Sequence, residues 1–341
     1  MERKLASIQT VSDIQPIEGA DLIEVATVRG WKLVVKKNEY KSGDLAIYCE
    51  IDSFLPIRPE YEFLRKSSHK KMGDVEGFRL RTVKLRGQVS QGLLLPMETL
   101  IGRADIIDLS VISEGDDVTQ ALGIVKYEPP IPAQLAGVMR GVFPSFIPKT
   151  DEERVQNLTD IYEALVAKGD RYYTTEKLDG SSVTYYHNEG LFGVCSRNLD
   201  LLETPENSLW KVARTLDMER KLSVLGNFAL QGELIGEGVQ GNPYKLRGQT
   251  VKFFNCFNIN TQCYLPYNLF KSIIDTMGLE SVPVLEDAYR LPPSIDVLLQ
   301  QAEGRSCLSP QAEREGIIIR SHDRSVSFKV ISNKFLLKET A

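Results

Sequence analysis

The sequence has few of the side chains that build zinc sites, disulfide frameworks or membrane anchors. Its three histidines, His69, His187 and His322, lie too far apart in the chain to indicate a zinc site. Its five cysteines include no Cys-x-x-Cys pair, so we expect reduced thiols in a cytoplasmic type of compartment. No apolar run approaches the length of a membrane span, and the first residues contain no apolar signal segment. These absences predict a soluble cytoplasmic protein that needs no membrane.

The net charge is small for a chain of 341 residues. At −5, with 26% charged and 42% hydrophobic residues, the composition is that of a globular protein. A nucleic-acid partner would therefore have to be held by a local basic patch rather than by the charge of the whole chain. The length favours two domains, because a single hydrophobic core rarely serves a chain of this size.

The amino-terminal part consists of short apolar segments separated by turn residues. Strands are predicted at Leu22–Val28, Trp31–Val35, Leu45–Cys49, Phe78–Arg86 and Gly92–Pro96. Short strands at this spacing indicate a small closed or nearly closed β-barrel of the OB type. We expect this domain to cover residues 1–128.

Basic residues concentrate in one part of this domain, between residues 65 and 86, where only Asp74 and Glu76 oppose them. One interpretation is a solvated edge strand whose charges prevent aggregation. The other, which we prefer, is a track for a nucleic-acid backbone, because OB-type domains pair a basic groove with exposed aromatic rings. The track would consist of Arg79, Arg81, Lys84 and Arg86, and the rings would be those of Tyr61, Phe63 and Phe78.

Residues from about 100 to 148 lose this periodicity. The segment Glu128-Pro129-Pro130-Ile131-Pro132 cannot form a helix or an inner strand, because proline lacks the backbone donor that both need. We therefore predict a linker over 129–148 and a second domain over 149–341.

The second domain is predicted to be α+β and built on antiparallel sheet. Asp151 is expected to cap a helix that ends at Gly169. Two runs rich in Tyr and Thr then flank an Asp-Gly turn, which predicts a hairpin over Tyr172–Tyr186 with Lys177 at its mouth. Later strands are expected at Leu191–Cys195, Phe228–Ile235, Val251–Ile259, Gly316–Arg320 and Val326–Val330, and later helices at 205–225, 266–278 and 294–303.

One motif of this domain is misleading. Gly236-Glu237-Gly238-Val239-Gln240-Gly241 has the letters of the dinucleotide-binding pattern G-x-G-x-x-G. However, Asn242-Pro243 follows where a helix should begin, and no acidic residue ends a second strand about twenty residues later. The sequence therefore does not predict a dinucleotide site here.

Three carboxylates fall at predicted strand ends, those of Asp179, Glu233 and Glu315. Because a buried unpaired charge is costly, such acids need partners, and a hard cation such as Mg²⁺ would satisfy several at once through water. Partial burial, a metal and a second cation such as Lys329 would lower the pKa of Lys177 and free its amine to attack a phosphate. The alternative is a scatter of ordinary surface ion pairs.

Six segments in order resemble the signature motifs of the covalent nucleotidyltransferases, which include ATP-dependent RNA ligases, DNA ligases and mRNA capping enzymes. They are Glu176–Gly180, Ser196–Asn198, Gly232–Gly236, Phe253–Ile259, Glu315–Arg320 and Ser327–Lys329. Near the amino terminus, Phe54–Ile57 and Arg81–Gly87 resemble the OB module of RNA ligases of the Deinococcus and Naegleria type. DNA ligases and capping enzymes instead carry their OB domain after the last motif, where this chain has only residues 330–341.

The resemblance implies an ATP-dependent RNA ligase that joins 3′-OH and 5′-phosphate ends, in RNA repair. Lys177 would attack the α-phosphorus of ATP and form a lysyl-AMP. The AMP would pass to the 5′-phosphate of the RNA, and the 3′-OH would then displace it. The resemblance further implies ATP as substrate, Mg²⁺ or Mn²⁺ as cofactor, RNA in a nicked or gapped duplex as partner, and no required oligomer.

The resemblance also assigns roles to single residues. Those that would contact the nucleotide are Glu176, Lys177, Leu178, Arg197, Glu233, Phe257 and Lys329. Those that would surround the metal, through water, are Asp179, Glu233 and Glu315. Those that would hold phosphates are Arg154, Arg197 and Lys329. Phe257 would stack on adenine, with a plain core residue as an equal alternative.

Two positions depart from the family pattern, and two other functions stay open. Ser182 stands where many relatives have Arg or Asn, and Ser327 where they have a second lysine, so the phosphate contacts are expected to differ. A DNA-sealing ligase is one alternative, because nothing in the sequence reads out a 2′-OH. A non-catalytic RNA-binding protein is the other, although the intact Lys177 argues against it.

Overall fold

A computed structural model describes residues 4–103, 107, 110–128 and 138–338. The chain divides into two compact units, one formed by residues 1–131 with 336–341 and the other by residues 132–335. The range predicted as a linker, 129–148, includes the short strand β13 (Met139–Val142), which pairs with β17 (Leu199–Leu201) of the second unit. Residues 129–137 lie outside the described residues.

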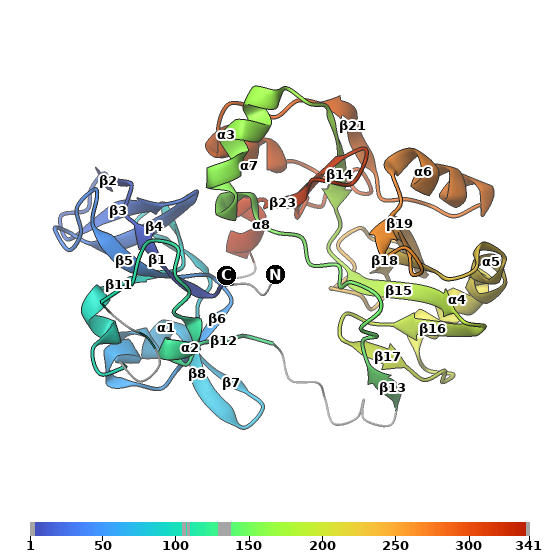
Figure 1. Ribbon diagram of the computed structural model, residues 1–341, viewed down its shortest axis with the longest axis horizontal. Helices are drawn as coiled ribbons and strands as arrows, with labels where there is room; N and C mark the ends of the chain where they lie inside the picture. The colour runs from blue at the N-terminus through green and yellow to red at the C-terminus, as the bar shows by residue number, and fades with distance from the viewer. Residues whose placement is uncertain (1–3, 104–106, 108–109, 129–137, 339–341) are drawn as a thin grey trace. The chain divides into compact units, whose positions relative to one another are not determined.

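The first unit consists of short antiparallel strands arranged in small sheets (Figure 1). The strands are β1 (Ala6–Thr10), β2 (Asp13–Pro16), β3 (Ile23–Val28), β4 (Trp31–Lys36), β5 (Leu45–Cys49), β6 (Ser53–Pro56), β7 (His69–Met72), β8 (Val75–Arg79), β9 (Thr82–Leu85), β10 (Gln88–Gln91), β11 (Leu93–Leu95) and β12 (Val125–Lys126). They form the sheets β1-β5-β11, β2-β3-β4, β9-β10 and β12-β6-β8-β7. Short helices are α1 (Arg65–Ser68) and α2 (Thr119–Leu122).

Two of the aromatic rings predicted to be exposed on this unit are buried. Tyr61 and Phe78 are 0% exposed and belong to an apolar core with Ile47 and Leu55. Phe78 lies opposite Leu55 in the β6–β8 ladder, which turns its ring toward that core. Only Phe63 of the three is exposed, at 64%. The predicted stacking surface is therefore wrong for Tyr61 and Phe78.

The strand predicted over Phe78–Arg86 is two strands of different sheets. β8 pairs with β6, whereas β9 pairs with β10 through a turn at Arg86-Gly87. Both turn residues have left-handed backbones, with φ of +48° and +84°, as tight hairpins require. Arg79 and Lys84 consequently lie on different sheets, and no single strand carries the predicted track.

The second unit is built on two antiparallel sheets (Figure 1). The larger has the order β13-β17-β16-β15-β18-β19-β20 and the smaller β21-β14-β22-β23. The remaining strands are β14 (Tyr172–Lys177), β15 (Ser181–Asn188), β16 (Leu191–Cys195), β18 (Phe228–Gly236), β19 (Gln249–Asn258), β20 (Cys263–Tyr264), β21 (Val284–Tyr289), β22 (Gly316–Ser321) and β23 (Ser327–Ile331). The helices are α3 (Thr159–Lys168), α4 (Ser208–Thr215), α5 (Met218–Leu225), α6 (Tyr267–Thr276) and α7 (Ile295–Ala302). The last helix, α8 (Asn333–Lys338), begins in this unit, and its residues 336–338 belong to the first unit.

Each sheet buries one face under helices. Apolar side chains of α4, α5 and α6 pack with the larger sheet in one core, around Trp210, Leu222 and Phe270. Side chains of α3 and α7 pack with the smaller sheet in another, around Tyr162 and Leu298. Among the described residues no helix is long and apolar enough to span a membrane.

The hairpin predicted over Tyr172–Tyr186 does not form. β14 belongs to the smaller sheet and β15 to the larger one, and residues 178–180 cross between them. Gly180 serves a close approach rather than a turn, because a Cβ atom there would lie 2.3 Å from the carbonyl oxygen of Leu234. Lys177 therefore stands at the junction of two sheets, not at the mouth of a hairpin.

The helix predicted from Asp151 begins later. A 3₁₀ helix at Val155–Asn157 precedes α3, and no side chain caps α3 at Leu158. The predicted end is confirmed, since Gly169 has the left-handed φ of +67° typical of a helix C-terminus. Asp151 instead pairs with Arg197, 2.8 Å away.

Candidate functional site

The site centres on Lys177, the last residue of β14. Its backbone is paired with Gly316 at the start of β22, which brings the preceding residue, Glu315, next to it. The Lys177 Nζ donates a hydrogen bond to Glu315 Oε1 over 2.6 Å, and the lysine side chain is 27% exposed. The structure thus brings together two predicted residues that lie 138 positions apart in the chain.

Glu233 supplies the larger sheet's part of this site. It lies in β18 opposite Ser182 of β15, directly after the crossover. Burial raises the pKa of Glu233 to about 8. Lys177 opposes this shift, and the charges of Glu315 and Asp179 add to it. Because burial is the main cause, the carboxyl is hard to ionise chiefly because it is shielded from water.

The same carboxylates act on Lys177. Burial alone would lower the pKa of its amine, but Glu315, Glu233 and Asp179 together outweigh burial and raise that pKa. The protein's own residues therefore raise this pKa, because the nearest charges are acidic. The predicted lowering depends on a bound metal and stays a prediction. The amine must lose a proton before it can act as a nucleophile.

The three carboxylates offer hard oxygen donors of the kind that Mg²⁺ and Mn²⁺ prefer. Among the described residues, however, no three or more Asp, Glu, His or Cys side chains are arranged to hold a metal ion. The roles of Asp179, Glu233 and Glu315 around a metal, through water, stay predictions.

Glu176, next to the lysine, has an incomplete set of hydrogen bonds. It is 1% exposed, and its Oε2 accepts a hydrogen bond from the Cys307 backbone over 2.7 Å. Its Oε1 is buried and has no partner among the described residues. Because buried acceptors are almost always satisfied, this oxygen points to a donor that binds there.

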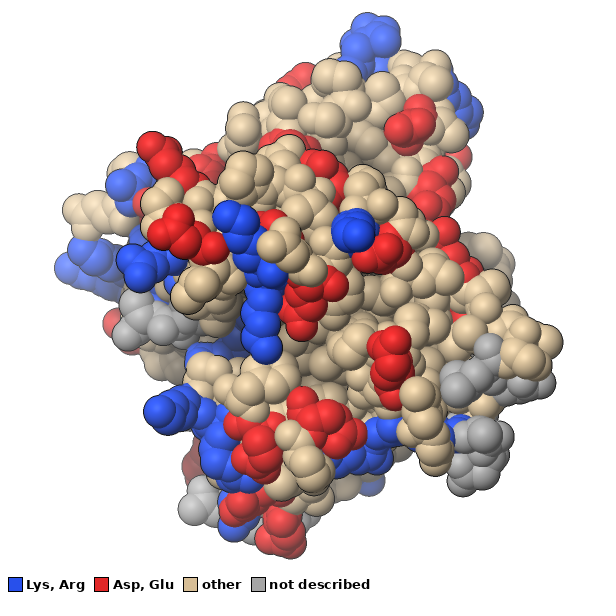
Figure 2. All heavy atoms as spheres, turned by 90° about the vertical axis from the view of Figure 1, so that its left-hand side faces the viewer, with Lys and Arg blue, Asp and Glu red and all other residues tan. Residues whose placement is uncertain are grey.

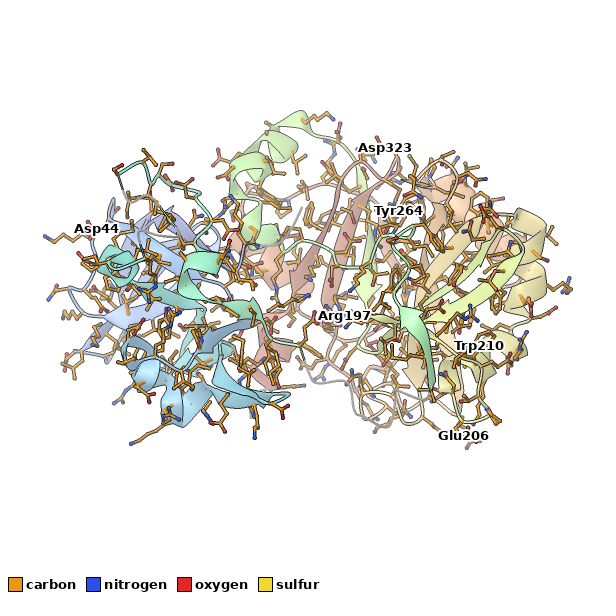
Figure 3. All side chains as sticks on the ribbon, turned by 60° about the horizontal axis from the view of Figure 1, so that its bottom comes forward. Asp44, Arg197, Glu206, Trp210, Tyr264 and Asp323 are labelled. Carbon is orange, nitrogen blue, oxygen red and sulfur yellow. The ribbon has the colours of Figure 1, made fainter. Side chains whose placement is uncertain are left out.

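The predicted phosphate-binding cations stand on elements that border Lys177. Arg197 follows β16 (Figure 3). Its side chain is 59% exposed, and its charge favours ionisation of Glu233. Lys329 in β23 pairs with Ile318, which pairs with Thr175, so these side chains share the face of Lys177 in the smaller sheet. The backbone of Arg154 runs parallel beside Lys329. Their phosphate contacts stay predictions.

Two further predicted residues are buried. Phe257 is 3% exposed and packs with Phe143 and Ile147, edge-on to Tyr264 at 5.1 Å between ring centroids. Leu178 packs in a small apolar cluster with Tyr244. Adenine stacking by Phe257 stays a prediction.

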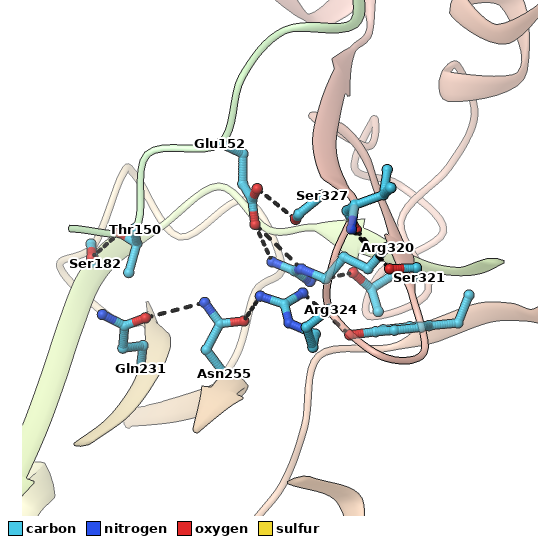
Figure 4. Close-up of polar contacts among 12 residues, drawn as sticks. Thr150, Glu152, Ser182, Gln231, Asn255, Arg320, Ser321, Arg324 and Ser327 are labelled. Atoms are coloured by element: carbon cyan, nitrogen blue, oxygen red, sulfur yellow. Dashed lines mark hydrogen bonds and ion pairs between the residues drawn. The ribbon is translucent and has the colours of Figure 1, made fainter. Parts of the chain in front are cut away.

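A polar network that the sequence did not predict ties residues 148–153, here called the strap, to the larger sheet (Figure 4). The Gln231 side chain of β18 donates to the Pro148 carbonyl over 2.8 Å. The hydroxyls of Thr150 and Ser182 share a hydrogen bond of 3.1 Å. Ser182, one of the two departures from the family pattern, therefore holds the strap.

The strap is tied to the smaller sheet by Glu152. Its carboxylate accepts hydrogen bonds from Arg320 Nη2 over 2.9 Å and from Ser327 Oγ over 2.6 Å (Figure 4). Burial opposes ionisation, but Arg320 and Ser327 outweigh it and lower the pKa of Glu152. A second arginine, Arg324, donates to Asn255 of β19 over 2.8 Å. Because Glu152 and Arg320 are 168 positions apart, no local pattern could have predicted their contact.

Comparisons with known proteins show the family of this chain. A sequence model described as RNA ligase matches residues 170–334. A structure of a mutant of Naegleria gruberi RNA ligase with AMP and Mn is 42% identical, with a TM-score of 0.91 over 99% of this chain and 100% of that chain. The chain belongs to the RNA ligase family. A second mutant of that RNA ligase, with ATP and Mn, is 42% identical with a TM-score of 0.88 over 98% of each chain. A comparison with curated proteins gave no match.

Membership of the RNA ligase family confirms the predicted enzyme class and fold class. A sequence model described as OB-fold domain matches residues 5–97, within the first unit, and the α+β unit with two antiparallel sheets follows it. The predicted order, with the OB-fold before the catalytic motifs, is confirmed.

The basic residues of this OB-fold differ in how far they are engaged. Arg79 pairs with Asp52 at 3.0 Å and lies over the ring of Tyr127, with 4.6 Å to its centroid. Lys84 and Arg86 are exposed on the β9–β10 hairpin. On the face drawn in Figure 2, Lys and Arg side chains are interspersed with Asp and Glu side chains. The nucleic-acid track stays a prediction, and its exposed part is the hairpin.

Proposed function

We propose that this RNA ligase uses ATP to join 3′-OH and 5′-phosphate RNA ends in RNA repair, through lysyl-AMP and RNA-adenylate intermediates. The observation that carries the proposal is Lys177, whose Nζ lies at the junction of two sheets within 2.6 Å of Glu315 Oε1 and among three carboxylates. Structures of the Naegleria gruberi RNA ligase with ATP and with AMP support it.

Adenine recognition is assigned to the residues beside the lysine. The exocyclic amino group of adenine is a hydrogen-bond donor, and the unpartnered Oε1 of Glu176 is the acceptor that would receive it. A base with an oxygen at that position would leave this acceptor unpaired and bind less well. Leu178 and Phe257 would line the base.

The chemistry requires an unprotonated amine. Glu315 Oε1 is in hydrogen-bond contact with the Lys177 Nζ and is placed to accept its proton. The amine then attacks the α-phosphorus, so that an N–P bond forms while the P–O bond to pyrophosphate breaks. Arg154, Arg197 and Lys329 would hold the phosphates in line, since phosphoryl transfer depends on position and charge. An oxygen of the RNA 5′-phosphate next displaces the lysine, and the 3′-OH finally displaces AMP.

Asp179, Glu233 and Glu315 would hold Mg²⁺ or Mn²⁺ through bound water. The grouping of the three carboxylates around Lys177 supports this fit, because a divalent cation would offset their negative charge. A bound divalent cation would also lower the pKa of Lys177 and neutralise phosphate oxygens.

The preferred RNA is proposed to be a nicked or gapped duplex, held in part by the OB-fold through Arg81, Lys84 and Arg86. All five cysteines are unpaired, which suits a reducing compartment such as the cytoplasm.

The proposal is tested by the intact mass of the protein after incubation with ATP and Mg²⁺. We expect a gain of one AMP that is lost on adding pyrophosphate and is absent in Lys177→Ala. Lys271→Ala, which removes a half-exposed lysine paired with Asp275 on α6, is the control and should keep the adduct. Folded wild-type protein that gains no AMP, or an adduct that survives in Lys177→Ala, would overturn the proposal.

A further inference from the structure

The connection between β18 and β19, residues 237–248, has an unusual backbone. The two strands pair to their ends, at Gly236 and Gln249, so a tight turn of a few residues could have joined them. Instead the connection contains three non-glycine residues with left-handed φ angles, Gln240 at +47°, Asn242 at +52° and Lys245 at +54°. Left-handed backbone is unfavourable for such residues and persists only where surrounding contacts impose it.

Contacts within the connection hold this conformation. The Asn242 side chain donates to the Leu246 carbonyl over 2.9 Å and accepts from the Leu246 amide over 3.1 Å. The Glu237 amide donates to the Gly248 carbonyl over 2.9 Å. At its base, Gly236 has a φ of +120°, and a Cβ there would lie 2.1 Å from the Gly248 oxygen. The connection is therefore a built loop with a defined shape.

This loop contacts all three residues that follow Lys177. The Asp179 amide donates to the Tyr244 hydroxyl over 2.6 Å, and the Gln240 side chain donates to the Gly180 carbonyl over 3.2 Å. The ring of Tyr244, which is 4% exposed, packs with Leu178. Residues 178–180 lie between β14 and β15 and outside both named strands, so strand pairing does not fix them. The loop holds the crossover instead.

We propose that Tyr244 is a positioning residue for the nucleophile. Its hydroxyl fixes the peptide before Asp179, and this peptide sets the direction of the chain immediately after Lys177. A nucleophile must approach phosphorus in line, and small displacements of a reacting group cost large factors in rate. The inference rests on the proposed function, because its consequence is the rate at which Lys177 accepts AMP.

The test compares two tyrosines that each lose one hydroxyl. Tyr244→Phe removes the hydrogen bond to the crossover. Tyr162→Phe is the matched control. Tyr162 lies on α3 and is 2% exposed, and its hydroxyl donates to the Pro292 carbonyl over 2.9 Å. Single-turnover formation of the AMP adduct is measured against ATP concentration, and sealing of a chemically pre-adenylated RNA nick is measured separately because it needs no attack by Lys177.

We expect Tyr244→Phe to slow adduct formation at saturating ATP by about tenfold or more, with half-saturation by ATP within about threefold of wild type. Sealing of the pre-adenylated nick should stay within about threefold of wild type in both variants, and Tyr162→Phe should keep its adenylation rate. Wild-type adenylation by Tyr244→Phe, equal loss in both steps, or the same loss in Tyr162→Phe would overturn the positioning role. A wild-type protein without any adduct would overturn the proposed function and this inference with it.

Discussion

The ion pair between Glu152 and Arg320 makes a quantitative prediction about stability. Glu152→Gln keeps the shape of the side chain and an oxygen that Arg320 can reach, but it removes the negative charge. Arg320 is only 3% exposed, and a second, half-buried arginine, Arg324, already has its pKa lowered by burial and by Arg320. The variant would leave the buried Arg320 and its half-buried neighbour Arg324 without this carboxylate.

The expected cost follows from this arrangement. Removing one partner of a buried ion pair costs about 3–5 kcal/mol of folding stability. Because Glu152→Gln retains hydrogen bonds, we expect it to cost about 3 kcal/mol, the lower end of this range. For a unit of this size that corresponds to a fall in melting temperature of roughly 6–12 °C. The pKa of Glu152 lies below its ordinary 4.5, so the carboxylate stabilises the fold fully above that pH. Wild type should lose this advantage as the pH falls through the lowered pKa.

Urea unfolding at pH 7 measures the loss. Because the two units can unfold separately, the signal should come from the second unit alone. The chain has two tryptophans, Trp31 in the first unit and Trp210 in the second (Figure 3), so a Trp31→Phe background leaves Trp210 as the only indole reporter. The midpoint should fall while the slope stays the same.

An exposed ion pair supplies the control. Asp170→Asn breaks the pair between Asp170, whose side chain is 45% exposed, and Lys168, whose side chain is 69% exposed. It should shift the unfolding midpoint far less than Glu152→Gln does. If Glu152→Gln costs no more than Asp170→Asn, the network does not hold the strap. If Glu152→Gln stays as much less stable than wild type at low pH as at pH 7, the role of the Glu152 charge is likewise refuted.

Two further predictions concern the OB-fold and Glu233. Removal of residues 1–128 should leave lysine adenylation largely intact and weaken nick sealing; equal sealing by the truncated and full-length proteins would show that the OB-fold does not hold the RNA. The pKa of Glu233 is raised to about 8, so the folded protein keeps a proton that the unfolded chain loses above pH 4.5, and stability falls as pH rises through this window. Without added nucleotide or metal, Glu233→Gln should therefore melt about 3 °C or more above wild type at pH 8 and close to wild type at pH 5. Equal melting temperatures of Glu233→Gln and wild type at pH 8 would contradict the raised pKa of Glu233.

Local pattern predicts most strands but not the sheets they join. Leu45–Cys49 is predicted correctly at both ends, because a short apolar run between turn residues has few other interpretations. The Asp-Gly pair after Lys177 predicts a turn because such pairs favour hairpins. In the structure the chain instead crosses from one sheet to the other at Gly180, close to the Leu234 carbonyl, and Leu234 lies far along the chain. The basic neighbours of Phe78 predict an exposed ring. Its pairing with Leu55 in the β6–β8 ladder instead places the ring on the buried face of the sheet.

The site is predictable where a residue type carries its own chemistry. Lys177 and Glu315 stand out because lysine and carboxylates at strand ends need partners, and the structure joins them. Glu152 and Tyr244 do not stand out. An acid in a charged segment and a tyrosine after Asn-Pro look ordinary, and their roles come from Arg320 and Asp179, which only the fold brings near.

The strap also bears on where the catalytic module of this ligase can be cut and joined to other proteins. The RNA ligase sequence model begins at residue 170, yet the fold that contains the site begins earlier. A fragment that starts at 170 would lose Glu152 and Thr150 and would strip Tyr162 from the core beneath the smaller sheet. Such a fragment would lose the hydrogen bonds by which the strap joins the two sheets. Domain exchange between ligases of this kind should therefore place its junction before Pro148, because the Pro148 carbonyl accepts a hydrogen bond from the Gln231 side chain.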